Sequence, residues 1–451
     1  MYFVWYKGVS KSSGKTQDYR LTLTKNIDHE LDNEHFLSRT KNGSDKVFTR
    51  NRVLTCRYVI LLIMSFQSSI QRDLDRFYKA ISKNDFNIRS VTKGALSLAR
   101  KKLNAWGFSR LNEVAVESFY AEAEYFVWHG MRLLSIDGST SILPNHPTVQ
   151  EKFSPCAFGP KNTSLRSLGR ISMLYDVLNH LAIDARIDPF QVSERTQLQT
   201  HLAKIERGDL LLLDRGYPSF KLFFELHARG IEYCMRLNEN WWKLAREFVQ
   251  GDQRDEVIQF RLPEKHKSKL VLELAEVPAE LSIRLVKVLL PGGGVEVLAT
   301  SLIDQQKYSQ EDISHLYTYR WNEEEAFKLL KSRMDLAAFS GKTLDAVMQD
   351  FHAKVFMLTL MAAYAHPIEE RVRREYKADQ SRKHDQKINR TSAIASLRDL
   401  LVPLFVRKTF EKSIKAFDDL AYSTREIIRP NRHNPRNKRT KVPPPLNYRH
   451  L

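Results

Sequence analysis

Four side chains between residues 317 and 331 have the types and spacing to handle phosphate. Tyr317, Arg320, Glu324 and Lys331 are separated by two, three and six residues. At about 100° per residue of an α-helix they fall within one narrow stripe. A phenol, a guanidinium, a carboxylate and an ammonium together suit phosphate contacts around a metal-binding acid. The alternative is a solvated helix face with ordinary ion pairs.

An apolar stripe runs beside this polar one, and the two predict a single packed helix over 317–331 with few breakers. Three glutamates follow one another within it, and only Glu324 falls in the polar stripe. We therefore select Glu324 as the acid, and not Glu323 or Glu325. The apolar stripe comprises Leu316, Phe327, Leu330 and Met334.

Two aspartates upstream could join this glutamate. Asp137 ends a short apolar run and precedes Gly138, which is typical of a strand end. Asp214 ends a run of four leucines at 210–213, which predicts a strand buried on both faces. Open α/β sheets bind ligands at the carboxyl ends of such strands. One aspartate alone is more often a turn or cap residue, but two strand-end acids with an acid on a later helix are more specific.

Three neighbouring carboxylates suit phosphodiester transfer. Two divalent ions about 3.5–4 Å apart can activate the attacking oxygen and stabilise the leaving one. Mg²⁺ takes one or two carboxylates together with water and phosphate oxygens. Three acids can therefore hold two Mg²⁺ ions, with Mn²⁺ as a substitute and one aspartate bridging. Without metal the acids repel one another, and at least one pKa should rise.

These motifs resemble a known family. The spacing Tyr-x2-Arg-x3-Glu-x6-Lys resembles the Tyr-Arg-Glu-Lys signature of bacterial insertion-sequence transposases, and the acids resemble the DDE triad of RNase H-like transposases. The run Asp-Arg-Gly-Tyr at 214–217 is also typical of that family. The resemblance implies that the catalytic and metal-binding residues are Asp137, Asp214 and Glu324. The residues it assigns to DNA binding are Tyr317, Arg320 and Lys331, joined by Arg215 and Tyr217 from the second motif.

The expected fold is α/β: an RNase H-like catalytic core with a β-rich insertion, flanked by N- and C-terminal helical regions. The order strand, strand, strand, helix, strand, helix, strand is that of an RNase H-like fold. We expect strands near 132–137, 170–178, 180–187, 210–214 and 232–237, with helices at 193–205 and 220–228. Short β-prone runs follow at 257–260, 270–274, 283–288 and 295–298, with a glycine-rich turn at 291–294.

The expected division of the chain follows from these elements. Residues 1–50 are polar with little periodicity, so we expect little regular structure there. The other segments are a helical DNA-binding region at 51–128, the first part of the core at 129–240, the insertion at 241–306, the catalytic helix and the next helix at 307–367, a helical region at 368–428 and a basic tail at 429–451. Pro367 should end or kink the helix that contains it.

The insertion carries two adjacent tryptophans, Trp241 and Trp242. In cut-and-paste members of the resembled family, the insertion supplies an aromatic wedge that helps flip a base near a DNA hairpin. A flipped base needs a replacement stacking surface, so an aromatic side chain fits this role. Burial in an ordinary apolar core is the equal alternative for both tryptophans.

The composition agrees with a nucleic-acid partner. Lys and Arg number 71 against 53 Asp and Glu, giving a formal net charge of +18, which favours polyanions. The three cysteines are widely separated, which indicates no disulfide framework and suits a reducing cytoplasm. The longest apolar runs, 58–64 and 355–365, are too short to cross a bilayer, so we expect no membrane partner.

The resemblance also implies the partners. These are double-stranded DNA at transposon ends and target DNA, a homodimer in the synaptic complex, and a bacterial, nucleoid-associated location. The basic helical stretch 92–103 could bind the ends, although an ordinary amphipathic bundle would look similar. Apolar residues between Ile394 and Leu404 are a candidate dimer surface, with intramolecular packing as the alternative.

The sequence thus predicts a metal-dependent DNA transposase that moves an insertion sequence, by a cut-and-paste route. Two other classes of protein are compatible with the same sequence. A decayed transposase could act as a DNA-binding repressor, although the intact acids speak against it. A stand-alone RNase H-like nuclease could use the same triad, although the basic flanks and the Tyr-Arg-Glu-Lys helix speak against that.

Overall fold

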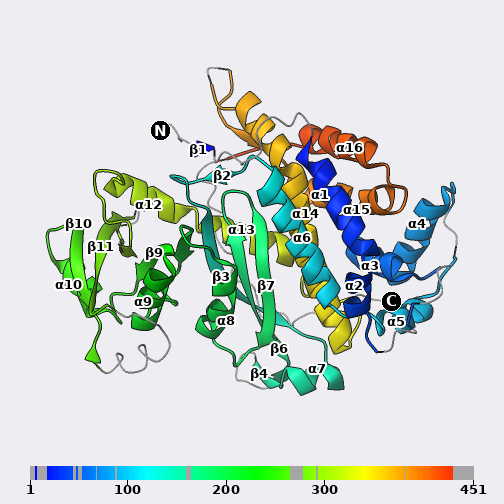
Figure 1. The fold of residues 1–451 in the computed structure, drawn as a ribbon, viewed down its shortest axis with the longest axis horizontal. Coiled ribbons are helices and arrows are strands. Elements are labelled where there is room, and N and C mark those ends of the chain that lie inside the picture. Colours follow the sequence, from blue (N-terminus) through cyan, green and yellow to red (C-terminus); the bar gives the residue numbers. More distant parts are fainter. Residues whose placement is uncertain are drawn as a thin grey trace.

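The computed structural model describes residues 6–7, 18–43, 47–48, 53–67, 69–86, 89–158, 164–264, 278–290, 293–379 and 381–429 of the 451-residue chain. An eight-stranded sheet forms its centre, and a large helical body lies at one end of that sheet (Figure 1). The insertion strands lie at the opposite end, at the left of the view.

Five strands form the core of the sheet, in the order β7-β6-β3-β8-β9. β3 pairs in parallel with β8 and antiparallel with β6, β8 pairs in parallel with β9, and β6 pairs antiparallel with β7. This is the strand order of an RNase H-like sheet, so the predicted core is confirmed. The strands are β3 (Leu133–Ile142), β6 (Leu168–Asp176), β7 (Leu181–Pro189), β8 (Leu210–Leu213) and β9 (Glu232–Leu237).

The insertion extends the same sheet and does not form a separate one. β12 pairs antiparallel with β9, and β11 and β10 follow outward as antiparallel neighbours. The predicted strands at 257–260, 283–288 and 295–298 are confirmed, whereas the run at 270–274 lies outside the described residues. These elements are α10 (Lys243–Gln250), β10 (Asp255–Arg261), β11 (Glu280–Leu289) and β12 (Val295–Thr300).

The leucine strand β8 is buried on both faces, as predicted. Leu211 and Leu213 belong to the apolar cluster that includes side chains of α8 (Glu194–His201) and α9 (Phe220–Arg229). Leu210 and Leu212 belong to the larger cluster on the other face, which includes side chains of the helices after the insertion. Alternate residues of one strand therefore anchor two helical layers.

The large helical body gathers around α14 (Leu344–Glu375), which packs on β7, α3, α6, α15 and α16. Its members come from both ends of the chain, so the N- and C-terminal helical regions share one core. They are α1 (Tyr19–Asp32), α2 (Glu34–Thr40), α3 (Cys56–Ser65), α4 (Ile70–Ser82), α5 (Lys93–Arg100), α6 (Trp106–Glu122), α15 (Arg390–Phe405) and α16 (Phe410–Ser423).

The remaining elements in the described part of the chain are short, and six of the strands pair in three two-stranded sheets. They are β1 (Tyr6–Lys7), β2 (Phe126–Val127), α7 (Pro147–Lys152), β4 (Cys156–Phe158), β5 (Ser164–Arg166), β13 (Gln386–Lys387) and β14 (Glu426–Ile427), with a 3-10 turn at Leu202–Lys204.

The expectation of little regular structure in residues 1–50 is wrong for residues 18–43. Asp18 and Asn33 cap α1 and α2 by accepting hydrogen bonds from backbone amides. Leu23 and Ile27 of α1 are buried in the large cluster. The polar composition concealed this apolar face, which is stabilised by helices distant in sequence.

The expectation that Pro367 ends or kinks its helix needs correction, because α14 continues to Glu375. Proline cannot donate a backbone hydrogen bond, so the carbonyl of Ala363, four residues earlier, loses its helical partner. The hydroxyl of Tyr19 in α1 donates a hydrogen bond to that carbonyl. A tertiary contact thereby replaces the missing helical bond, and the expected domain boundary at 367/368 falls inside a helix.

The candidate dimer surface in the C-terminal region is also corrected. Ile394, Leu397, Leu401 and Leu404 of α15 are at most 2% exposed. They belong to the large core cluster, and α15 packs on α3, α14 and α16. These side chains are therefore used within one chain.

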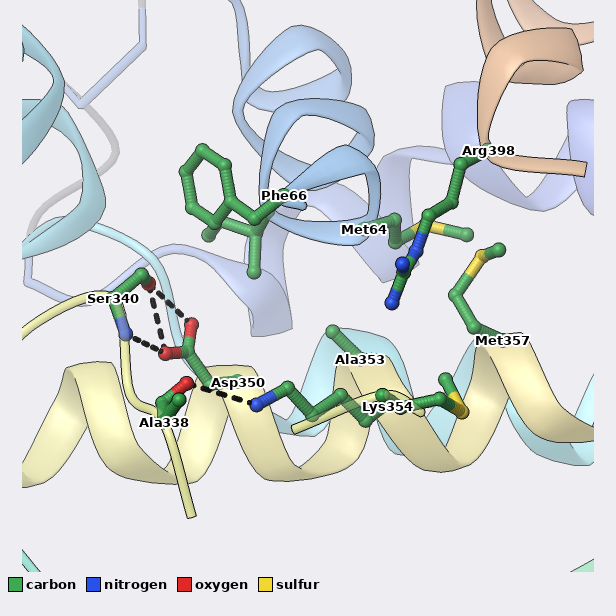
Figure 2. Close-up of a pocket in the computed structure, with 11 residues that line it drawn as sticks. Met64, Phe66, Ala338, Ser340, Asp350, Ala353, Lys354, Met357 and Arg398 are labelled. Carbon is green, nitrogen blue, oxygen red and sulfur yellow. Dashed lines mark hydrogen bonds between the residues drawn. The ribbon is translucent and has the colours of Figure 1, made fainter. Parts of the chain in front are cut away.

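A buried ion pair joins α5 to α14. Arg100 donates to the Asp350 carboxylate at 2.9 Å. The Ser340 amide and hydroxyl also donate to that carboxylate, as Figure 2 shows. Burial acts to raise the pKa of Asp350, but Arg100, Lys354 and Ser340 hold it below its usual value. Arg100 is thus a structural residue, although it lies in the stretch expected to bind DNA.

In the part of the chain that the structure describes, no helix has both the length and the apolar character needed to span a bilayer.

The replacement of a helical bond by Tyr19 predicts a measurable coupling. Tyr19→Phe should lower the free energy of unfolding by about 1 kcal/mol, the usual contribution of one buried hydrogen bond. Pro367→Ala supplies an N–H that can bond to Ala363, so Tyr19→Phe should cost less in that background. Urea unfolding of the four proteins measures the coupling, and an equal cost in both backgrounds would contradict this account.

Candidate active site

The register between β3 and β8 brings the two predicted aspartates together. Leu133 pairs with Leu210 and Ile136 with Leu213 in parallel. The next residues along the chain are Asp137, which is still in β3, and Asp214, which directly follows the end of β8. Neighbouring strands lie about 4.8 Å apart. By strand alternation both side chains point to the face that carries Leu210 and Leu212. Two acids therefore lie side by side where β8 ends.

The predicted single helix over 317–331 is two helices, α12 (Gln310–Thr318) and α13 (Trp321–Ser332). Between them the amides of Tyr319, Arg320, Asn322 and Glu323 bond to carbonyls three residues earlier, which tightens the chain into a 3-10-like turn. Side-chain bonds to the sheet hold each helix separately. The Tyr317 hydroxyl donates to the Leu213 carbonyl, and the Asn322 amide donates to the Val177 carbonyl at 3.0 Å.

Arg320 lies at this junction and joins two of the predicted acids. Its guanidinium is 2.8 Å from the Glu324 carboxylate and 3.7 Å from the Asp137 carboxylate. The Arg320 side chain is only 8% exposed, while those of Asp137 and Glu324 are 26% and 31% exposed. In this state the arginine supplies the positive charge between the two acids.

The pKa of Asp137 is raised to about 6. Burial is the main cause; the Gly138 amide and Arg320 oppose it, while the Glu324 and Asp214 carboxylates raise the pKa further. Repulsion between the acids therefore exists, as expected for carboxylates gathered without metal. A divalent cation at the site would favour the ionised form.

Of the other two signature residues, Tyr317 is buried and Lys331 is exposed. Tyr317 is 6% exposed, and its hydroxyl bonds to the carbonyl of the residue before Asp214 at 3.3 Å. Burial raises the pKa of this phenol. Lys331 is exposed. Partial removal of water from its ammonium group lowers the pKa of Lys331, while the negative charge of Asp137 acts to raise it. Lys331 therefore lies at the surface within the field of the acids.

In the Asp-Arg-Gly-Tyr motif the arginine side chain is exposed and the tyrosine side chain is buried. The Arg215 amide donates to the Asp214 carboxylate at 2.6 Å, and the Arg215 side chain is exposed. Tyr217 is 2% exposed, and its hydroxyl has no hydrogen-bond partner among the described residues. Burial, followed by Asp137 and Glu194, raises the Tyr217 pKa. Tyr217 therefore points into the protein beside the acids.

Sequence reasoning set aside Glu323 and missed Ser135. Glu323 is fully buried, and it accepts hydrogen bonds from the Ser135 hydroxyl and from the Asp137 amide, the latter at 2.9 Å. A signal for this position was present. Glu323 precedes Phe327 by four residues and Leu330 by seven, so it lies on the packed stripe of α13.

Glu194, at the start of α8, is a second acid that the sequence did not indicate. A Cβ added at Gly138 would lie 3.0 Å from its carboxylate, and Arg170 pairs with that carboxylate at 3.0 Å. A side chain at position 138 would therefore require Glu194 to move. Glycine after Asp137 keeps this edge of β3 open.

The donor set suits a divalent metal, although its side chains are not yet gathered around one point. Among the described residues, no three acid, histidine or cysteine side chains lie close enough to hold an ion. Carboxylate oxygens are the ligands that Mg²⁺ and Mn²⁺ prefer. Arg320 now lies between two of the acids. The residues therefore fit a metal, provided that the guanidinium moves aside.

Comparisons with known proteins identify the family of this chain. The family model described as the transposase DDE domain matches residues 128–360, which is more than half of the chain. The chain belongs to this family. The matched region begins just before β3 and ends within α14, so it contains Asp137, Asp214 and Glu324.

Two relatives come from Escherichia coli strain K12. The putative transposase InsZ is 23% identical over 207 residues, which cover 45% of this chain and 67% of the relative. The transposase InsG of insertion sequence element IS4 is 22% identical over 305 residues, which cover 66% of each chain. The similar region thus spans about two thirds of each relative.

A solved structure of the piggyBac transposase synaptic complex with hairpin DNA is 10% identical. It has a TM-score of 0.47 and covers 91% of this chain and 87% of that one.

The buried position of Tyr317 separates its ring from its hydroxyl. Tyr317→Ala should cost about 3–5 kcal/mol of stability, as for other large aromatic truncations in a core. Tyr317→Phe should cost about 1 kcal/mol or less, because it removes one long hydrogen bond. Thermal unfolding and end-DNA binding should be measured for both variants. Equal losses would mean that the hydroxyl, and not ring packing, carries the role.

Proposed function

We propose that this DNA transposase excises and inserts an insertion-sequence element, using metal-dependent cleavage and strand transfer in a cut-and-paste route. The observation that carries the proposal is the parallel register that sets Asp137 beside Asp214, with Glu324 joined to Asp137 through Arg320. Membership of the transposase family supports the choice of DNA as substrate.

Asp137, Asp214 and Glu324 would hold two divalent ions, Mg²⁺ with Mn²⁺ as a substitute. When bound, such ions supply positive charge to the attacking and leaving oxygens of the phosphodiester. The protein's own contribution is geometric. Two strand ends and a helix held to the sheet would bring the three carboxylates toward one place, which would limit the reorganisation required at each cleavage.

Arg320 has two roles in this proposal. In the free protein its guanidinium neutralises Glu324 and Asp137. When metal takes over those acids, the guanidinium can turn to a DNA phosphate, which it recognises through paired N–H donors. Lys331 and Arg215, which are exposed beside the acids, would contact the same backbone. Tyr317 and Tyr217 would support the DNA-binding surface from within.

Double-stranded DNA at the element's ends and at the target is the proposed partner. The formal net charge of +18 supports binding to a polyanion. In the N-terminal region Lys93, Lys101 and Lys102 are exposed, so they are better candidates for phosphate contacts than Arg100. Because two ends must be processed together, we propose a homodimer in the synaptic complex.

Trp241 is the better candidate for the base-flipping wedge. It is 68% exposed in the turn after β9, whereas Trp242 is 8% exposed and packs against Phe220, Phe223 and Phe260. An exposed indole can stack on a base without disturbing the core. We place the protein in the bacterial cytoplasm, associated with the nucleoid through its DNA.

The triad assignment predicts a clean separation of binding from cleavage. Asp137→Ala, Asp214→Ala and Glu324→Ala should each abolish cleavage of end DNA in Mg²⁺ while leaving end binding largely intact. Glu325→Ala removes the exposed neighbouring acid and serves as the control. Cleavage of labelled end DNA and of a scrambled duplex should be compared. Near-normal cleavage by Asp214→Ala would remove that residue from the site.

The phosphate-contact assignment predicts a change in salt dependence. Arg320→Ala and Lys331→Ala should each reduce the slope of log affinity against log salt by about 0.9 for one lost phosphate contact. Lys328→Ala is a matched control, because Lys328 is exposed on the same helix and pairs with Glu325. Slopes unchanged from wild type in both test variants would place these side chains away from DNA.

A further inference from the structure

Glu323 is a fully buried acid beside the proposed catalytic acid Glu324. It lies in the first turn of α13 with no exposed surface. One of its carboxylate oxygens accepts the Ser135 hydroxyl, and the other accepts the Asp137 amide at 2.9 Å. Both partners belong to β3, so one side chain of the helix bonds to two sites on the strand that carries Asp137.

The bond to Asp137 is made just beyond the last β3–β8 pair. β8 ends at Leu213, which pairs with Ile136, whereas β3 continues and Asp137 pairs with Met173 of β6. The Glu323 carboxylate reaches the Asp137 amide from α13. The helix therefore contacts β3 at the residue where its pairing with β8 ends.

Glu323 connects two of the proposed metal-binding acids, because it bonds to the Asp137 backbone and directly precedes Glu324. The Asp137 amide donates to Glu323, and Glu324 is the next residue after Glu323 in the helix. The neighbours of Glu323 on the packed face of α13 are Ala326, Phe327 and Leu330, which are buried and apolar. Burying an acid among them costs stability unless its hydrogen bonds compensate. An apolar side chain would pack there without linking α13 to β3.

We propose that Glu323, together with Ser135, is a positioning residue that fixes Asp137 and Glu324 at the spacing needed for shared divalent ions. The inference rests on the proposed function and deepens it. Neither Glu323 nor Ser135 contacts DNA or metal. Their effect is exerted through the backbone of β3 and the first turn of α13.

The test compares variants that keep or remove the acceptor. Glu323→Gln retains an oxygen for the Asp137 amide, and Glu323→Ala removes it. Ser135→Ala removes only the hydroxyl donor. Thr359→Val is the control, because the buried Thr359 hydroxyl donates to the Ala182 carbonyl away from the acids. It measures the effect of losing one buried hydrogen bond elsewhere in the core.

Three readouts distinguish positioning from stability. The first is the rate of end cleavage and the Mg²⁺ concentration for half-maximal rate. The second is the rise in thermal unfolding midpoint that Mn²⁺ gives the free protein, which reports metal affinity without catalysis. The third is hydrogen exchange of peptides covering residues 133–142.

Glu323→Ala should raise the required metal concentration by about 10- to 100-fold, as for loss of a residue that supports a metal ligand. It should also lower the Mn²⁺-induced midpoint shift and speed exchange in β3. Glu323→Gln should restore all three readouts to near wild type, and Ser135→Ala should be intermediate. Thr359→Val should lower the midpoint alone.

Two results would overturn the proposal. One is Glu323→Ala behaving like Thr359→Val, with an unchanged metal requirement. The other is Glu323→Gln failing as severely as Glu323→Ala, because the acceptor would then not be what matters. If Glu323→Ala does not fold, Glu323→Gln and Ser135→Ala decide by the same readouts. If wild type does not cleave end DNA, the proposed function fails, and the Mn²⁺ shift and exchange still decide the positioning role.

Discussion

The structure depends on one constraint, the parallel pairing of β3 with β8 in a register that ends with Ile136 opposite Leu213. Asp137 follows Ile136 in β3 and Asp214 directly follows β8, so like charges meet at the end of a buried strand pair. Burial and the neighbouring carboxylates raise the pKa of Asp137 to about 6. The chain balances this charge with Arg320, which lies between Asp137 and Glu324. The positive charge of Arg320 thus offsets part of the repulsion between the acids.

Helices α12 and α13 are held to the sheet by polar side-chain bonds as well as by apolar packing. Tyr317 bonds to the end of β8, Asn322 to the β6–β7 turn and Glu323 to β3. These contacts explain the break between α12 and α13, because each helix is held to a different part of the sheet. Apolar packing alone would allow the helix to slide, whereas directional bonds fix its position along the strand.

The rest of the chain supports this arrangement from two sides. The insertion strands continue the core sheet beyond β9, so the end of β8 lies inside a continuous sheet and not at its edge. On the other side α14 packs on β7 and on helices from both termini. The buried pair of Arg100 and Asp350 joins α5 to α14. Segments far apart in sequence therefore form one scaffold behind the acids.

The sequence alone determined the strands of the core sheet and the class of protein. Strand-end aspartates, the four-leucine strand and the helical spacing of Arg320, Glu324 and Lys331 are local patterns, and the RNase H-like strand order followed from them. It could not show where bonds cross the fold. The burial of Tyr317, the replacement bond from Tyr19 beside Pro367, the use of Leu397 in the core and the role of Glu323 depend on partners far away in sequence. Only tertiary structure decides these features, because periodicity shows which face of a helix packs but not which distant polar group meets it.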